Sequence, residues 1–74
     1  MVRKIKLKQD QIQHFVNCTS RCDFEIDIYY NSYIVDAKSF LGVYGLDHSK
    51  VLTVSYDGYN REFEELLGTL SIAC

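Results

Sequence analysis

The sequence predicts an α+β fold: an open-faced β-sandwich with the element order βαββαβα, in which a four-stranded antiparallel sheet carries three helices on one face. Two observations support this prediction. Four segments alternate apolar and polar residues with a period of two, as half-buried strands do, and three others space apolar residues as one face of a helix does. With 74 residues and 47% hydrophobic side chains, residues 1–74 are expected to form one domain around one small core.

The first strand and the first helix are predicted near the start of the chain. Residues 4–8 read Lys-Ile-Lys-Leu-Lys, which places Ile5 and Leu7 toward the core and the lysines toward water. The spacing then becomes helical, and one face consists of Ile12, Phe15, Val16 and Thr19. Asp10 is expected to cap this helix or to lie in its first turn, where the helix dipole favours negative charge.

A β-hairpin is predicted in the middle of the chain. Its first strand places every second residue toward the core, namely Phe24, Ile26, Ile28 and Tyr30. Asn31-Ser32 is a two-residue turn signal, although a weaker one than Asn-Gly. The second strand is expected to continue on the same face with Tyr33, Val35 and Ala37.

Two helices and a strand complete the fold. Residues 38–46 predict a short helix, with Ser39 as its N-cap and Gly45 near its end. A fourth strand follows, with core positions Leu52, Val54 and Tyr56. Asn60 is expected to cap the last helix, whose core face consists of Phe63, Leu66, Leu67 and Leu70.

The composition excludes several classes of partner. The formal net charge is −2 with both signs interspersed, so the chain lacks the broad basic field of nucleic-acid-binding proteins. No apolar run approaches the roughly 18 residues of a membrane span, and the first residues contain no signal-peptide segment. The expected compartment is the cytoplasm, where the three cysteines would remain reduced thiols.

Residues 35–43 read Val-Asp-Ala-Lys-Ser-Phe-Leu-Gly-Val, a short strand that leads into a Lys-Ser pair and a small apolar helix. This segment resembles the region around the regulatory serine of HPr, the histidine-containing phosphocarrier of the bacterial sugar phosphotransferase system. The element order, His14-Phe15-Val16 and Leu52-Thr53-Val54 extend the resemblance over nearly the whole chain. It implies the HPr-like open-faced sandwich. HPr carries its phosphate on a histidine in a Gly-x-His-x-Arg-Pro turn, whereas residues 7–11 here read Leu-Lys-Gln-Asp-Gln.

The resemblance implies two sites. Ser39 matches the serine that a dedicated kinase phosphorylates in many Gram-positive bacteria, and Phe40, Leu41 and Tyr44 match exposed positions at which HPr docks partner proteins. A phosphate on Ser39 would lie over the free N–H groups of the short helix, with Lys38 as a nearby cation. Two alternatives remain open: Ser39 is only an N-cap, and Phe40 and Tyr44 fold over the edge of the core.

The histidines and cysteines are expected to have structural rather than chemical roles. His14, Cys18 and Cys22 are spaced i, i+4, i+8 on a helix, but they drift around it: Cys22 lies near the apolar face, Cys18 at its edge and His14 almost opposite that face. A fourth zinc ligand is also lacking. The cysteines are therefore expected to pack as small apolar residues and His14 to be solvated, with no metal or cofactor. Cys74 is expected to be a free, exposed thiol, and His48 to lie in a surface loop.

These observations support one leading hypothesis and two alternatives. The leading hypothesis is an HPr-like protein that is not an enzyme, has lost phosphohistidine transfer and acts by binding another protein. Its contact surface would be the helix from Ser39 to Leu46 and the adjacent start of the first helix. The first alternative is a functional phosphotransferase-system or carbon-regulation component that is phosphorylated at Ser39. The second is catalysis or metal binding at His14, Cys18 and Cys22.

Overall fold

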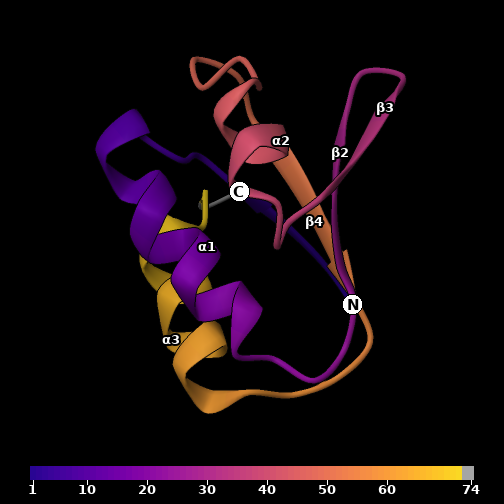
Figure 1. Ribbon diagram of the computed structural model, residues 1–74, viewed down its shortest axis with the longest axis vertical. Coiled ribbons are helices and arrows are strands. Elements are labelled where there is room, and N and C mark those ends of the chain that lie inside the picture. Colours follow the sequence, from indigo (N-terminus) through magenta and orange to yellow (C-terminus); the bar gives the residue numbers. More distant parts are fainter. Residues whose placement is uncertain (73–74) are drawn as a thin grey trace.

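A computed structural model describes residues 1–72 and shows a four-stranded antiparallel sheet with its three α-helices on one face (Figure 1). The strand order is β1-β4-β2-β3. The predicted fold class and element order are thereby confirmed. The elements are β1 (Val2–Ile5), the 3-10 turn η1 (Gln9–Gln11), α1 (Ile12–Ser20), β2 (Ile26–Tyr30), β3 (Tyr33–Asp36), α2 (Phe40–Tyr44), β4 (Leu52–Tyr56) and α3 (Arg61–Leu70).

The core lies between the sheet and the helices. Each of the four strands, or the residue that follows it, places apolar side chains on the inner face, and these pack with apolar residues of α1, α2 and α3 in one cluster. Its fully buried members include Ile5, Phe15, Ile26, Ile28, Ala37, Val43, Leu52, Val54, Phe63 and Leu67. The predicted core positions of α1 and β4 are confirmed, as are Ile26 and Ile28 of β2. The other predicted core positions at the margin of the cluster are only partly buried, namely Phe24, Tyr30, Val35 and Leu66.

The N-terminal segment departs from the predicted boundaries. β1 covers Val2–Ile5 rather than residues 4–8, although Leu7 is buried as expected. The ladder with β4 ends at the pair Ile5–Leu52, and the Lys6 N–H then donates to the carbonyl of Leu70, at 3.1 Å. The chain therefore leaves the sheet for the end of α3 after Ile5. Asp10 lies in η1 and does not cap α1, whose N-cap is Gln11.

The β2–β3 hairpin forms at the predicted turn, but part of its predicted core face is exposed. Asn31 has φ of 53°, a left-handed conformation that asparagine tolerates, and the flanking Tyr30 and Tyr33 pair. Tyr33 was expected to face the core, yet 64% of its surface is exposed. Tyr33 lines an open groove whose other side is formed by Gly42, Gly45 and Leu46, so its ring stays largely in solvent.

Side-chain caps define the starts of α2 and α3. Ser39 Oγ accepts from the Gly42 N–H at 3.2 Å, and Asn60 Oδ1 accepts from the Phe63 N–H at 3.0 Å, as the sequence predicts. Helix α2 covers Phe40–Tyr44 and is therefore shorter than the predicted helix over residues 38–46. The expectation for Cys74 concerns a residue outside those that the structure describes.

A buried tyrosine connects β4 to α3. The Tyr56 hydroxyl donates to Glu64 at 2.6 Å, and Glu64 also accepts from Arg3 of β1 at 3.3 Å. Burial raises the pKa of Tyr56 to about 12, and the hydrogen bond to Glu64 contributes to the rise. The proton is therefore held more tightly in the folded state than in an unfolded chain.

The substitution Phe15→Ala tests the core. Because Phe15 is fully buried, we expect it to lower the free energy of unfolding by about 3–5 kcal/mol in urea titrations followed by circular dichroism. Gln13→Ala, at an exposed position of the same helix, is the control and should change stability by less than about 0.5 kcal/mol. A loss below about 1 kcal/mol for Phe15→Ala would contradict the assigned packing of α1.

Tyr56 predicts a loss of stability in alkali. Its folded pKa of about 12 exceeds the ordinary value of 10, so its contribution is complete below pH 10 and disappears as the pH rises through 12. Urea midpoints measured between these pH values should fall more steeply for the native protein than for Tyr56→Phe. Tyr59→Phe, at an exposed tyrosine, is the control and should follow the native protein. Equal slopes for native protein and Tyr56→Phe would refute the assignment.

Candidate protein-binding surface

Helix α2 exposes three large apolar side chains, Phe40, Leu41 and Tyr44, which we call the α2 surface. Their exposed fractions are 38%, 81% and 50%, and the rings of Phe40 and Tyr44 stack with centroids 5.9 Å apart. Val43 is the buried residue of this helix. A helix this short, anchored by one residue, leaves its other apolar side chains in solvent, so Phe40 and Tyr44 do not fold into the core edge.

Polar contacts hold the α2 surface in position. The Gln9 side-chain amide donates to the Tyr44 hydroxyl at 3.0 Å and so joins η1 to α2. The Ser39 cap fixes the first turn of the helix. The sequence hypothesis that the start of the first helix lies beside the short helix is consistent with this contact. The apolar side chains are thus presented on a constrained backbone with a polar rim.

Ser39 is exposed at the start of α2, where its hydroxyl oxygen serves as the helix cap. Lys38 was expected to provide a cation beside it. Instead, the Lys38 ammonium donates to the carbonyl of Cys22 at 2.9 Å, directly after the C-cap of α1. This contact engages Lys38 with the backbone, so its charge is not directed at the Ser39 hydroxyl.

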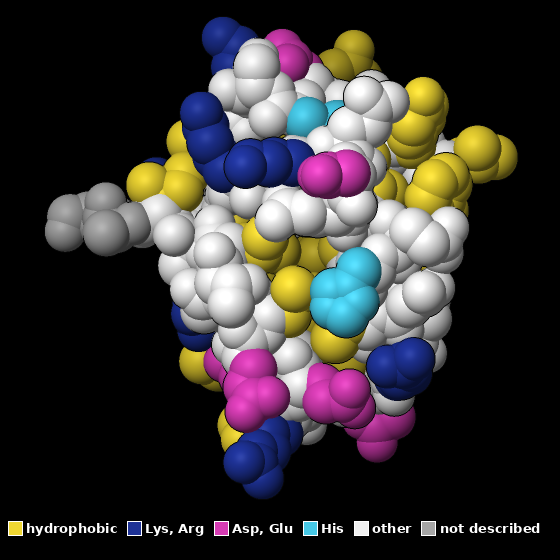
Figure 2. Space-filling view, turned by 90° about the vertical axis from the view of Figure 1, so that its left-hand side faces the viewer, with side chains coloured by type: hydrophobic (Ala, Val, Ile, Leu, Met, Phe, Trp, Pro, Cys, Tyr) yellow, Lys and Arg dark blue, Asp and Glu magenta, His cyan; other side chains and the backbone are white. Residues whose placement is uncertain are grey.

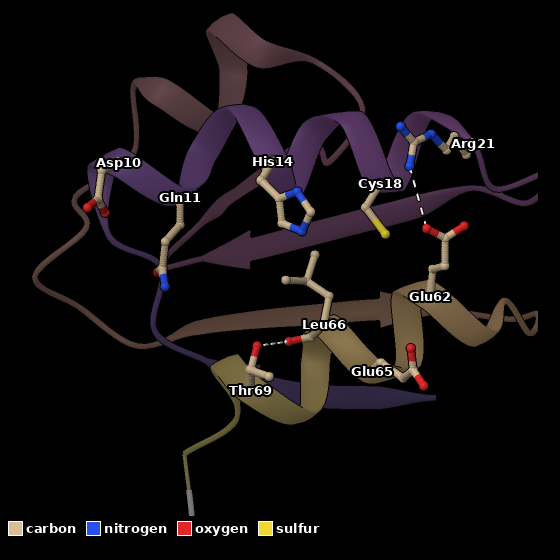
Figure 3. Close-up of a pocket in the computed structure, with 9 residues that line it drawn as sticks. All are labelled: Asp10, Gln11, His14, Cys18, Arg21, Glu62, Glu65, Leu66 and Thr69. Atoms are coloured by element: carbon tan, nitrogen blue, oxygen red, sulfur yellow. Dashed lines mark hydrogen bonds and ion pairs between the residues drawn. The ribbon is translucent and has the colours of Figure 1, made fainter.

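A hollow lies between α1 and α3 on the helical side of the molecule. Figure 2 views this side and shows hydrophobic side chains at the floor of the hollow and acidic side chains gathered toward one end. Its volume is about 460 Å³, and Figure 3 shows its lining residues: Asp10, Gln11, His14, Cys18, Arg21, Glu62, Glu65, Leu66 and Thr69. An ion pair between Arg21 and Glu62, at 3.6 Å, closes the end opposite Asp10.

The residues considered for catalysis or metal binding do not assemble a reactive site in this hollow. His14 is solvated, as expected, but it lines the hollow on the same side as Cys18, while Cys22 is not part of the lining. Cys18 and Cys22 are buried free thiols, and burial raises the pKa of both above the ordinary value, which disfavours the reactive thiolate. Within residues 1–72, no group of three or more histidine, cysteine or acidic side chains is placed to hold a metal ion.

His48 occupies a position that the sequence did not predict. It was expected in a surface loop, but it is half-buried, and its Nδ1 lies 3.1 Å from the carbonyl oxygen of Leu7. Its Nε2 atom is buried and has no hydrogen-bond partner. The loop after α2 therefore packs onto the segment that follows β1.

The structure also exposes apolar residues that were not expected at the surface from the sequence. Tyr29, Tyr33 and Ile34, at the outer end of the β2–β3 hairpin, are all exposed. The available signal was the interruption of alternation, because Tyr29-Tyr30 and Tyr33-Ile34-Val35 place apolar residues on both faces of their strands. A strand with this pattern either has both faces covered by other elements or leaves one apolar face exposed to solvent.

Comparisons with other proteins do not assign this chain to a family: no family model matches it, and no curated protein matches it. In residues 1–72, no helix is long and apolar enough to cross a membrane.

The exposure of Tyr44 predicts that binding and stability separate at this position. Tyr44→Ala should lower the free energy of unfolding by less than about 1 kcal/mol, because half of the ring is already in solvent. Val43→Ala, the adjacent buried residue, is the matched control and should cost about 2 kcal/mol. Thermal melts of both variants provide the measurement. A cost of about 2 kcal/mol or more for Tyr44→Ala would mean that Tyr44 is a packing residue.

Proposed function

We propose that this protein is an HPr-like, non-enzymatic module that binds another protein through the α2 surface and does not transfer phosphate through a histidine. The observation that carries the proposal is the exposure of Phe40, Leu41 and Tyr44 on one constrained helix, with Leu41 81% exposed. Exposed aromatic and aliphatic side chains clustered in this way are typical anchors of protein interfaces.

The rigidity of the surface supports a binding role. Val43 anchors α2 in the core, Ser39 caps it, and Gln9 holds the Tyr44 hydroxyl. Side chains that are already ordered lose little conformational entropy when a partner covers them, which favours affinity. The polar groups of Gln9 and Ser39 would then form the rim around an apolar centre.

The relation to HPr is part of the proposal, and so is the loss of phosphohistidine transfer. The order βαββαβα and the exposed helix after Ser39 agree with the HPr-like pattern of the sequence. Residues 7–11, in the position of the phosphocarrier turn, contain no histidine. His48 reaches this turn from another loop, but its Nδ1 contacts the Leu7 carbonyl and its Nε2 is shielded from solvent. Neither ring nitrogen is therefore open to a phosphoryl donor.

A cytoplasmic location completes the proposal. Cys18 and Cys22 are free thiols in the structure, a state that the reducing cytoplasm maintains. The proposal includes no nucleic-acid or membrane partner and no cofactor, and it expects a bacterial protein, as the HPr-like pattern implies.

The alternative function is regulation by phosphorylation of Ser39, within the phosphotransferase system or carbon regulation. It is favoured by the exposure of this hydroxyl at the first turn of α2. Phosphorylation would add about −1.5 to −2 charges beside the apolar α2 surface and would change which partner binds there. Lys38 contributes no neighbouring cation, because it contacts Cys22.

The proposal predicts binding without phosphohistidine formation. The isotope-labelled protein is titrated with the first enzyme of the phosphotransferase system and, separately, with the HPr-specific kinase, and amide shifts are followed by NMR. Shifts centred on Phe40, Leu41 and Tyr44 are expected for at least one of them, and Tyr44→Ala should weaken binding by more than about tenfold. Tyr59→Ala, at an exposed tyrosine outside the α2 surface, is the control and should bind as the native protein does.

Addition of phosphoenolpyruvate or ATP separates the alternatives. An acid-labile phosphohistidine would contradict the proposal, and an acid-stable phosphoserine at Ser39 would favour the regulated component. If neither protein shifts amides of the α2 surface, that result would also contradict the proposed binding function.

A further inference from the structure

The free edge of β3, Tyr33–Asp36, is an unprotected edge of the sheet. β3 is the last strand in the order β1-β4-β2-β3. Its exposed apolar residues Tyr33 and Ile34 lie at this edge, with exposed fractions of 64% and 63%. Exposed apolar edges are templates for pairing with another strand, and folded proteins ordinarily protect them with charges or covering segments.

The register of the hairpin shows which backbone groups face outward. Because a two-residue turn joins Tyr30 to Tyr33, these residues form a hydrogen-bonded pair, and Val35 is the next residue of β3 that bonds to β2. The Ala37 N–H donates to the Ile26 carbonyl at 2.9 Å, which continues the same alternation. The N–H and C=O of Ile34 and the N–H of Asp36 therefore point away from the sheet. The Asp36 carbonyl is engaged, since it accepts from the Ser39 N–H at 3.0 Å.

The opposite edge of the sheet is protected. In β1, the Lys4 carbonyl accepts from the Ile72 N–H at 3.1 Å, and the Lys6 N–H donates to Leu70. The segment after α3 thus covers the C-terminal end of the β1 edge, while the exposed Val2 lies at its start. In β3, by contrast, no backbone hydrogen bond from another segment covers Ile34 among residues 1–72.

An apolar groove runs beside the β3 edge on the helical face. It has a volume of about 370 Å³, and it is lined by Tyr30, Tyr33, Ile34, Val35, Gly42, Gly45 and Leu46. Gly42 allows α2 to lie close against the hairpin, because a Cβ at this position would come within 2.8 Å of Val35. A strand added beside β3 would direct every second side chain toward this groove.

The outer face of the same edge carries an acidic pair beside the exposed Ile34 and Tyr29. Asp36 of β3 pairs directly with Asp27 of β2, an arrangement of like charges that is unfavourable across strands. No ion pair to either carboxylate occurs among residues 1–72. A basic side chain on a strand next to Asp36 would neutralise this pair, whereas a second copy of β3 would bring two more acidic residues.

We propose that the β3 edge binds an extended segment of a partner protein as a fifth strand of the sheet. The segment alternates apolar residues, which enter the groove beside α2, with lysine or arginine, which faces Asp36 and Asp27 on the outer face. Backbone hydrogen bonds to Ile34 and Asp36 provide affinity, and the groove and the carboxylates provide specificity. This site is separate from the α2 surface, so it does not depend on the proposed function.

A synthetic peptide tests the proposal. The labelled protein is titrated with acetyl-Thr-Lys-Val-Lys-Val-Lys-Thr-amide and with the peptide in which glutamate replaces each lysine. The lysine peptide should shift the Ile34 and Asp36 amides and slow hydrogen exchange at the Ile34 N–H. The glutamate peptide should bind at least about fivefold more weakly, because it would place a carboxylate beside the Asp36–Asp27 pair in place of an ammonium group.

Two variants locate the interaction. Ile34→Pro removes an outward N–H without removing a bond to β2, so the protein should remain folded and lose detectable peptide binding. Val2→Pro is the matched control, because Val2 is 63% exposed at the other edge of the sheet, and it should bind normally. Asp36→Asn keeps the acceptor for the Lys38 N–H and should weaken binding about two- to fivefold, whereas Glu65→Gln on α3 should not.

The remaining outcomes would overturn the proposal. Absence of shifts at Ile34 and Asp36, or equal binding of the two peptides, would show that the edge does not select a basic strand. Shifts confined to Phe40, Leu41 and Tyr44 would place the peptide on the α2 surface, which would refute the edge site and leave the proposed function standing. Concentration-dependent self-association that Ile34→Pro removes would identify a second copy as the occupant instead.

Discussion

The fold depends on the packing of three helices against a single inner face of the sheet. Phe15 of α1 and Phe63 of α3 are fully buried against apolar residues of the strands, and they occupy the centre of the core. Because the helices cover only this face, the outer face and the projecting hairpin stay in solvent (Figure 1). A small domain buries a limited fraction of its surface, so apolar residues beyond this core remain exposed.

The short helix shows how this constraint produces a binding surface. α1 and α3 have nine and ten residues and fill most of the inner face, whereas α2 has five and inserts only Val43. Its other large apolar side chains cannot reach the core and lie outside it. The Ser39 cap and the Gln9–Tyr44 contact order this helix without burying it. Exposure and rigidity at the α2 surface thus have the same cause.

The two edges of the sheet differ because a later segment of the chain bonds to β1, whereas none bonds to Ile34 of β3 among residues 1–72. After α3 the chain runs along β1 and bonds to Lys4 and Lys6, which closes that edge. After β3 the chain turns at Asp36 into the Ser39 cap and leaves the edge open at Ile34. The groove beside α2 and the open edge are adjacent, so the hairpin and the short helix together form the most apolar exposed region of the described residues.

Local patterns in the sequence determined the element order, the inner face of α1, β2 and β4, and the caps at Ser39 and Asn60, because periodicity and capping act within one turn or one strand. The exposure of Phe40, Leu41 and Tyr44 was one of two open alternatives, and only the packing of α2 decided it. Tertiary structure alone also decided that Tyr33 projects into solvent, that Lys38 contacts Cys22 and that His48 packs on Leu7. These features depend on which distant segment covers a residue, and no local spacing encodes that neighbour.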